Sequence, residues 1–248
     1  ARIRKTSVAL VFVLPAGALY AVFFLKPLWE TARLSFHKWN GLTEPTFVGL
    51  ANFQTLLQDR LFWNALQHTA LWASVGALLP IGIALLLAVL VEDGRVRGKQ
   101  FFRSLFFVPQ VSSIAVTAGI WAVIYEPTYG LLNNAFRAAG LGGLARTWLG
   151  DPLFALPAVM FAWAWHFFAF AFVVYVAGLQ SLDRTLYEAA RVDGASWWRL
   201  FWHVTLPLLR RVHTMVVSLG IISSLRPFAV VWAMTQGGPY YATDVFPT

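Results

Sequence analysis

The stretch that decides the fold is PLFALPAVMFAWAWHFFAFAFVVYVAGLQSL, residues 152–182. It runs for 31 residues without an Asp, Glu, Lys or Arg. A helix needs about 20 predominantly apolar residues to cross the hydrocarbon core of a bilayer. The stretch also lacks the alternation of apolar and polar residues that marks a membrane-spanning strand. Residues 152–182 are therefore predicted to contain a transmembrane helix.

Four more runs of this kind occupy residues 6–25, 61–91, 104–125 and 212–243, and Arg226 is the only charge within them. The pattern predicts an all-α integral membrane protein, a polytopic helical bundle with spans at about residues 7–29, 62–91, 104–125, 156–179 and 206–234. The first run ends without a small-residue cleavage site, so we interpret it as an uncleaved anchor helix. Five spans leave the two ends on opposite sides, and we expect a sixth helix beyond Thr248.

The composition supports this class. Hydrophobic residues make up 58% of the chain and charged residues 12%, and the mean hydropathy is +0.63. Soluble domains carry roughly 45–50% apolar and about 25% charged residues. The sequence contains no cysteine, which excludes thiol catalysis, cysteine-ligated metals and disulfides.

The charged residues predict an orientation. With the N-terminus in the cytoplasm, the inner segments hold twelve basic and five acidic residues, and the outer segments hold six of each. An excess of Lys and Arg marks cytoplasmic loops. We therefore expect a multi-pass protein with a cytoplasmic N-terminus. Its net charge of +8 does not require a nucleic-acid partner.

The most informative segment outside the spans is LDRTLYEAARVDGASWWRLFWHVT, residues 182–205. It favours a helix up to Val192, a turn at Asp193-Gly194 and then a second amphipathic helix that runs into Pro207. Glu188 could contact a partner protein. It could instead close a capping box with Thr185 or form a pair with Arg191 on the same helix face.

This segment resembles the EAA loop of binding-protein-dependent ABC importer permeases. Glu188-Ala189-Ala190, Asp193-Gly194-Ala195 and Leu206-Pro207 stand at the spacing of that family. Five further regions resemble the carbohydrate branch, which includes the maltose and glycerol-phosphate systems. They are WNG with FVGLxNF at 39–53, FRxLFFxP at 102–109, YGLLN at 129–133, AGLQ at 177–180 and MTxGGP at 234–239. Arg226 departs from the family pattern.

The resemblance implies a single permease domain over residues 1–248 with a cytoplasmic EAA coupling loop at 182–205. Such a subunit moves a sugar or oligosaccharide inward from an extracytoplasmic solute-binding protein, in a bacterial or archaeal cytoplasmic (inner) membrane. Its implied partners are a second permease subunit, forming a heterodimer, and two ATP-binding subunits. ATP and Mg²⁺ are held by those ATP-binding subunits. The chain itself is expected to carry no cofactor, no metal and no catalytic residue.

The resemblance also implies roles for residues of the coupling loop. Glu188 is expected to make the ionic contact with the ATPase. Ala189 and Ala190 are expected to allow close packing, and Asp193-Gly194 to fix the turn.

Candidate solute contacts lie on two spans. Trp163, His166, Phe167 and Phe170 share one helical face at spacings of three and four residues, where aromatic rings could stack on sugars. Ser223, Ser224 and Arg226 bring polarity into the fifth span, and a charge within a membrane usually faces a cavity or a partner. Core packing is the alternative for the aromatic stripe, and a core hydrogen bond is the alternative for His166.

Other functions fit less well. A proton-coupled secondary carrier would usually carry Asp or Glu inside its spans, and none lies in these runs. The five histidines show no metal-ligand spacing. A nearer alternative is a permease of the same class for a polyol phosphate such as glycerol 3-phosphate, because the guanidinium of Arg226 suits phosphate oxygens.

Overall fold

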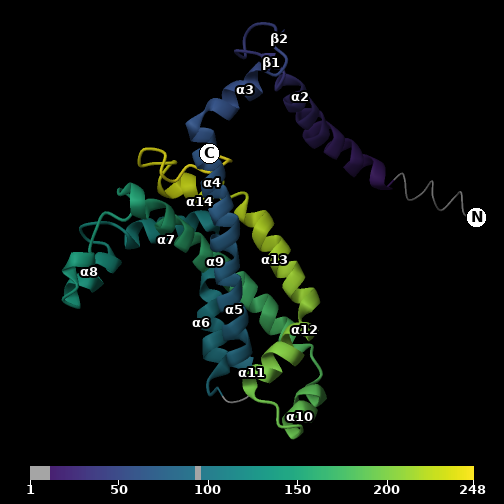
Figure 1. The fold of residues 1–248 in the computed structure, drawn as a ribbon, viewed down its shortest axis with the longest axis vertical. Coiled ribbons are helices and arrows are strands. Elements are labelled where there is room, and N and C mark those ends of the chain that lie inside the picture. Colours follow the sequence, from purple (N-terminus) through teal and green to yellow (C-terminus); the bar gives the residue numbers. More distant parts are fainter. Residues whose placement is uncertain (1–11, 93–95) are drawn as a thin grey trace, which may run out of the picture. The chain divides into compact units, whose positions relative to one another are not determined.

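The computed structural model describes residues 12–92 and 96–248 (Figure 1). The chain divides into two compact units, residues 1–63 and 64–248. The predicted start of the first span at residues 7–11 lies outside the described residues, as do five of the charges used for the orientation: Arg2, Arg4, Lys5, Asp93 and Arg95. The single permease domain over 1–248 stays a prediction.

The first unit consists of a long helix and a small hairpin. The helix runs over Phe12–Leu34 and contains η1 (Ala21–Leu25) and α2 (Lys26–Leu34). Strands β1 (His37–Lys38) and β2 (Thr46–Phe47) pair antiparallel, and α3 (Ala51–Gln58) follows. The side-chain oxygen of Asn40 accepts hydrogen bonds from the backbone N–H groups of Leu42 and Thr43, at 3.0 and 2.9 Å, which closes the turn between the strands.

The second unit is helical. Its elements are α4 (Arg60–Leu71, which begins in the first unit), η2 (Trp72–Gly76), α5 (Ala77–Glu92), α6 (Lys99–Val111), α7 (Ile114–Ile124), α8 (Leu131–Ala138), η3 (Gly142–Leu144), α9 (Pro152–Gln180), α10 (Arg184–Val192), α11 (Trp197–Leu200), η4 (Phe201–Thr205), α12 (Leu206–Leu208), α13 (Arg210–Ser224) and α14 (Phe228–Met234).

Helix α9 is the centre of this unit, and α5, α6, α7, α13 and α14 all contact it (Figure 1). The most deeply buried large side chains of the core include Trp72, Phe172 and Tyr175. Two glycines allow α13 to approach closely. A Cβ at Gly178 would lie 3.1 Å from side-chain atoms of Leu209 and Val212, and one at Gly220 would lie 2.8 Å from Ile81 Cδ1. These contacts bring α13 against both α5 and α9.

In the part of the chain that the structure describes, three helices are long and apolar enough to cross a membrane: Phe12–Leu34, Arg60–Glu92 and Pro152–Gln180. They correspond to the first, second and fourth predicted spans. Two further spans exist only if each of two bent helix pairs counts as one. Residues 12–92 and 96–248 thus hold three helices, or up to five spans if each bent pair is one, that could cross a membrane by length and composition, and two of the predicted spans are bent.

The predicted span at 104–125 is bent. Helices α6 and α7 meet at an angle of 100°, with Ser112 and Ser113 between them. Ser113 adopts extended backbone dihedrals, and its hydroxyl accepts a hydrogen bond from Val116 N–H, so it caps a new helix. The break follows Pro109, which cannot donate a backbone hydrogen bond.

The predicted span at 206–234 is also interrupted. The segment Trp197–Leu208 bends by 75° into α13, and α13 then ends at Ser224 before Pro227 precedes α14. Pro207 and Pro227 both lie at these interruptions. Hydropathy shows where a segment is apolar, whereas such breaks depend on local backbone dihedrals.

Candidate coupling site and solute cavity

Residues 182–205, which are predicted to be the coupling loop, contain α10, α11 and η4 and fold as a helical hairpin. Its first helix, α10, begins with a capped N-terminus. Asp183 is the N-cap of α10, and its Oδ1 accepts a hydrogen bond from Thr185 N–H at 2.9 Å. This bond favours the carboxylate and lowers the pKa of Asp183. The alternative capping box between Thr185 and Glu188 is therefore not the cap of this helix, because Asp183 occupies the N-cap position.

The end of α10 lies at the predicted Asp193-Gly194 turn. Gly194 has a φ of +78°, where a side chain would be strained. Its N–H donates to Arg191 O at 3.0 Å, and Ala195 N–H donates to Ala190 O at 3.0 Å. These two bonds form a Schellman motif, which satisfies the last carbonyls of the helix and reverses the chain.

The two halves of the hairpin are tied together. Tyr187 Oη donates a hydrogen bond to Thr205 Oγ1 at 3.1 Å, which joins α10 to η4. Glu188 and Ala189 are exposed, and Ala190 is half-buried. The structure thus leaves the predicted ATPase contacts on an accessible face, and their role stays a prediction.

A cavity of about 250 Å³ lies between the hairpin and the ends of α5, α6 and α9. We call it the coupling cavity. It is lined by Val89, Glu92, Lys99, Leu179, Gln180, Leu182, Tyr187, Glu188, Arg191, Trp197, Leu200, Phe201 and Thr205. Charged residues of both signs therefore line one cavity together with aromatic rings.

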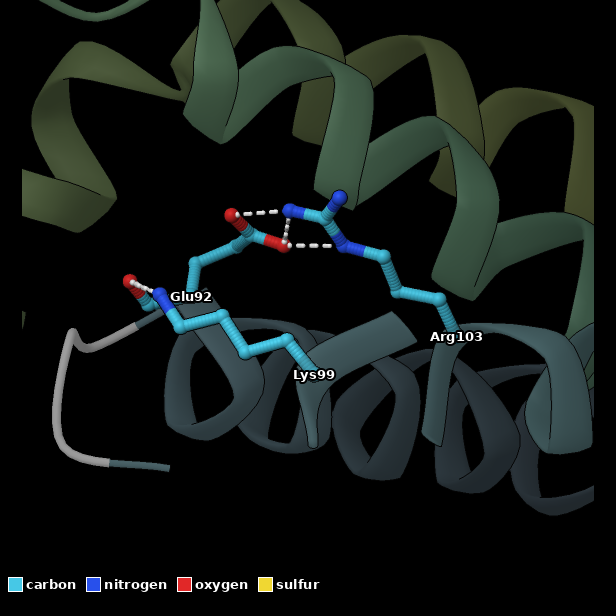
Figure 2. A network of polar contacts seen from close by, with 3 residues as sticks. All are labelled: Glu92, Lys99 and Arg103. Atoms are coloured by element: carbon cyan, nitrogen blue, oxygen red, sulfur yellow. Dashed lines mark hydrogen bonds and ion pairs between the residues drawn. The ribbon is translucent and has the colours of Figure 1, made fainter. Parts of the chain in front are cut away.

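Glu92, which lines the coupling cavity, forms an ion pair with Arg103 that the sequence did not reveal (Figure 2). Arg103 Nε donates to Glu92 Oε1 at 2.9 Å, and Arg103 Nη2 donates to Oε1 and Oε2 at 2.6 and 2.7 Å. Lys99 Nζ donates to the backbone oxygen of Glu92 at 3.2 Å. The partners come from different helices, so helical periodicity gave no indication of the contact.

A second cavity, of about 410 Å³, lies beside the break between α6 and α7 and the break between α13 and α14. We call it the solute cavity. It is lined by Gln110, Ile114, Trp163, His166, Phe167, Phe170, Leu219, Ser223, Arg226, Pro227, Ala229 and Val230. The structure thus gathers the four predicted residues of α9 and Arg226 around one space. Transporters build binding sites at such discontinuous helices, because unwound backbone needs a cavity or protein around it.

The aromatic residues of α9 serve both as core and as lining. The rings of Trp163 and Phe167 stack with their centroids 5.1 Å apart and an interplanar angle of 3°. The centroid of the Phe170 ring lies 5.7 Å from that of Phe167. Trp163 and Phe167 are only 6% and 7% exposed. Both rings therefore pack in the core and also belong to the lining of the cavity.

His166 stabilises the break between α6 and α7. Its Nδ1 lies 3.0 Å from Pro109 O, and because a carbonyl only accepts, this nitrogen donates the proton. Ser112 Oγ also donates to Pro109 O, at 3.2 Å, and lies 2.9 Å from Thr117 Oγ1. These bonds satisfy a carbonyl left open by the bend. The alternative of a hydrogen-bonded histidine describes this contact, and His166 still lines the cavity.

Among the polar residues of the fifth predicted span, two line the solute cavity and one is buried in the core. Arg226 is exposed and lines the cavity from the linker between α13 and α14. Ser223 lines it too, whereas the predicted Ser224 is fully buried and donates to Ile221 O at 2.8 Å. Gln110 was missed by the sequence reasoning. It lines the cavity, and its Oε1 is buried without a hydrogen-bond partner in the described part of the chain.

No metal site emerges from residues 12–92 and 96–248, because these contain no cluster of three or more His, Asp or Glu residues placed to hold an ion. The two cavities described above are candidate sites. One is lined by aromatic rings and a cation, and the other adjoins the exposed helical hairpin.

A helical membrane bundle whose interrupted helices adjoin a cavity has the architecture of a solute permease. The chain belongs to the family of binding-protein-dependent transport system inner membrane components, which matches residues 81–242. The predicted resemblance to carbohydrate ABC permeases is thereby confirmed.

Named relatives cover most of the chain. The lactose transport system permease protein LacF of Rhizobium radiobacter is 33% identical over 238 residues, which are 94% of this chain and 78% of LacF. The trehalose/maltose transport system permease protein MalF of Thermococcus litoralis is 32% identical, covering 97% and 81%. The sn-glycerol-3-phosphate transport system permease protein UgpA of Agrobacterium fabrum is 34% identical, covering 94% and 79%.

A solved structure shows the same fold. A chain of a bacterial alginate ABC transporter, in complex with an alginate pentasaccharide-bound periplasmic protein, superimposes with a TM-score of 0.83. The alignment covers 98% of this chain and 82% of that chain at 23% identity. At this identity the likeness establishes the architecture, and it says nothing about the solute.

Proposed function

We propose that this chain is a transmembrane permease subunit of an ATP-driven importer that moves a sugar or oligosaccharide inward. The solute cavity carries the proposal, because the aromatic side chains of Trp163, Phe167 and Phe170 line it, and aromatic rings suit the apolar faces of sugars. Polar groups at the same cavity, from Gln110 and Ser223, suit sugar hydroxyls. Relatives named for lactose and for trehalose/maltose support this class of solute.

The helical hairpin is proposed to be the coupling element. Glu188 makes the ionic contact with an ATP-binding subunit, Ala189 and Ala190 allow the close approach, and Asp193-Gly194 holds the turn. The exposed face of α10 and the Schellman motif support these roles. Nucleotide binding then biases an equilibrium between two arrangements of the helices, and the solute biases it through the cavity.

The proposed assembly contains this chain, a second permease subunit as its heterodimeric partner, two ATP-binding subunits and an extracytoplasmic solute-binding protein. ATP and Mg²⁺ bind the ATP-binding subunits, and this chain contributes no catalytic group. Its proposed location is the cytoplasmic membrane of a bacterium or archaeon, with the N-terminus in the cytoplasm. The excess of basic residues on one side of the spans supports that orientation.

The test is reconstitution. The full-length chain is purified from its native host, the co-purifying subunits are identified, and the complex is placed in liposomes with ATP inside and the binding protein outside. We expect an ATPase and a second permease to co-purify and sugar uptake to require ATP. A chain that purifies alone and transports solute without ATP would contradict the proposal and favour a secondary carrier.

A second candidate solute is a polyol phosphate such as glycerol 3-phosphate. Arg226 favours it, because this exposed guanidinium lines the solute cavity and no described carboxylate lies within 4.0 Å of it, as the two ion pairs in the described ranges are elsewhere. A guanidinium binds phosphate oxygens with charge-assisted hydrogen bonds. The relative named for sn-glycerol 3-phosphate also favours this candidate. Competition for uptake between a neutral sugar and its phosphate separates the two.

A further inference from the structure

We propose that Glu92 and Arg103 form a positioning pair that holds the ends of α5 and α6 rigid opposite the helical hairpin. Movement of the helical hairpin is then converted into movement of the spans. The inference rests on the proposed function, since it concerns how ATP use and transport are linked. It is carried by the geometry of the pair (Figure 2) and by the place of Glu92 in the lining of the coupling cavity.

The pair is a short contact between neighbouring helices. Glu92 is the last residue of α5 and Arg103 lies in the second turn of α6. Both carboxylate oxygens accept from the guanidinium, at 2.6 and 2.7 Å from Nη2. The side chains of Arg103 and Glu92 are 31% and 15% exposed. A bidentate, half-buried pair fixes both distance and direction, which an exposed monodentate contact does not.

The packing gives this pair a task. Helices α5 and α6 each contact α9 far more extensively than they contact each other. On α6, Phe106 packs edge-on against Phe168 and Phe172 of α9, at 5.7 and 5.1 Å. The contact from Arg103 to Glu92 therefore supplies a direct polar link between two consecutive helices whose packing is otherwise mainly against α9.

Lys99 also helps to hold the C-terminal end of α5 in place. Its Nζ donates to the backbone oxygen of Glu92, at the C-terminal end of α5. A carboxylate at a helix C-terminus is unfavourable beside the open carbonyls, and two cations offset that cost. Glu92 is thus held by both its side chain and its main chain, which makes the end of α5 a fixed part of the cavity wall.

The opposite wall is a separate element. The hairpin is held together internally by the bond from Tyr187 to Thr205, and it faces Glu92 and Lys99 across the coupling cavity through Glu188 and Arg191. An element that pushes on a wall transmits its displacement only if the wall does not yield. Loosening the link between α5 and α6 should therefore waste ATP hydrolysis without removing any contact to the ATPase.

The experiment measures solute moved per ATP hydrolysed by the reconstituted complex. Glu92→Gln and Arg103→Gln each remove the ion pair, and the double variant Glu92→Arg with Arg103→Glu reverses it. We expect each single variant to lower the ratio about fivefold or more, the lower range of coupling energies between sites. The reversed pair should recover most of the loss. Lys26→Gln is the control, since the pair from Lys26 to Glu30 is 4.0 Å long and its side chains are 69% and 56% exposed.

Each outcome decides the question. A wild-type ratio in both single variants overturns the positioning role, and so does a reversed pair that assembles but stays as uncoupled as the single variants. If a neutral variant fails to assemble, Arg103→Lys replaces it, because it keeps the charge and loses the bidentate contact. A wild-type complex without ATP-dependent uptake would instead refute the proposed function itself.

Discussion

The coupling cavity and the solute cavity differ in how their charges are satisfied. In the coupling cavity, Glu92 is paired with Arg103 and its main chain accepts from Lys99. In the solute cavity, Arg226 is exposed and no described carboxylate stands within ion-pair distance of it. A half-buried charge that is paired within the protein serves the structure, whereas one left without a protein partner at a cavity is available to a ligand.

The uncharged polar groups show the same contrast. Tyr187 and Thr205 satisfy each other at the coupling cavity, at 3.1 Å. At the solute cavity, the Oε1 of Gln110 is buried with no partner in the described residues. A buried polar atom without a hydrogen bond costs about 1–3 kcal/mol, and a solute hydroxyl that donates to it would recover this cost. The comparison therefore supports the proposed division, with transmission at one cavity and recognition at the other.

The largest expected effect comes from the exposed face of the hairpin. Glu188→Ala should lower ATP-dependent uptake about 100-fold, because one charge-assisted contact is worth up to about 3 kcal/mol. Membrane insertion should be unaffected, since Glu188 is exposed. Uptake in liposomes and retention of the ATPase during purification check this. Glu44→Ala, at another exposed acid, is the control, and full uptake with normal ATPase retention in Glu188→Ala would contradict the coupling role.

The next effect tests the charge at the solute cavity. Arg226→Gln should lower uptake of a phosphate-bearing solute about 10-fold or more, the value of one lost charge-assisted bond, and should change uptake of a neutral sugar less than about twofold. The thermal stability of the protein should stay the same, because no described partner loses its ion pair. Equal losses for both solutes would show that Arg226 serves the structure instead.

Sequence reasoning located the long helices better than their interruptions. The charge-free runs placed Arg60–Glu92 and Pro152–Gln180 closely, since apolar length is a direct requirement of the bilayer. The bend at Ser112-Ser113 escaped notice because hydropathy does not depend on backbone dihedrals. Two consecutive serines after Pro109 were a usable indication of a new N-cap.

The candidate sites were predictable where residues share one helix. The stripe from Trp163 to Phe170 lies on one face of α9, so its spacing alone gathered it. Ser223 and Ser224 were both selected for their polarity, and only Ser223 lines the cavity with Arg226, whereas Ser224 is buried. Gln110 and the pair of Glu92 with Arg103 depend on contacts between helices, which no periodicity within one segment reveals.

A third prediction concerns the packing of Gly220 against Phe167, which lines the solute cavity. A Cβ at Gly220 would lie 2.8 Å from Ile81 Cδ1 and 3.1 Å from Phe167 Cε1. Gly220→Leu should therefore destabilise the protein by about 1–3 kcal/mol through overpacking. Gly220→Ala should cost less, because the Ile81 side chain can rotate. Thermal unfolding in detergent measures both variants.

Gly82→Leu is the matched control for Gly220, since it lies on α5 with no atom within 4 Å of its added Cβ. It should leave the melting temperature within the range of the wild-type protein. An equal loss in both leucine variants would mean that the helix positions, and not the close approach of α13, limit the stability. A loss confined to Gly220→Leu would show that the wall bearing Phe167 tolerates no added volume.

The smallest expected effect is that of pH on the N-cap of α10, which tests the stability of the helical hairpin and not its contacts with other subunits. The pKa of Asp183 is lowered by the hydrogen bond from Thr185 N–H. Because the folded-state pKa lies below the unfolded value, the cap stabilises α10 above the unfolded pKa, and this stabilisation is lost as the pH falls through the folded pKa. Hydrogen exchange of the α10 amides in the assembled complex should therefore accelerate at acidic pH beyond the intrinsic rate change.

Asp183→Asn keeps a capping oxygen without a titrating group, so its α10 should lack that extra dependence. The same acid-dependent opening in Asp183→Asn would assign it to another group, and its absence from both proteins would show that the cap does not control the stability of the hairpin.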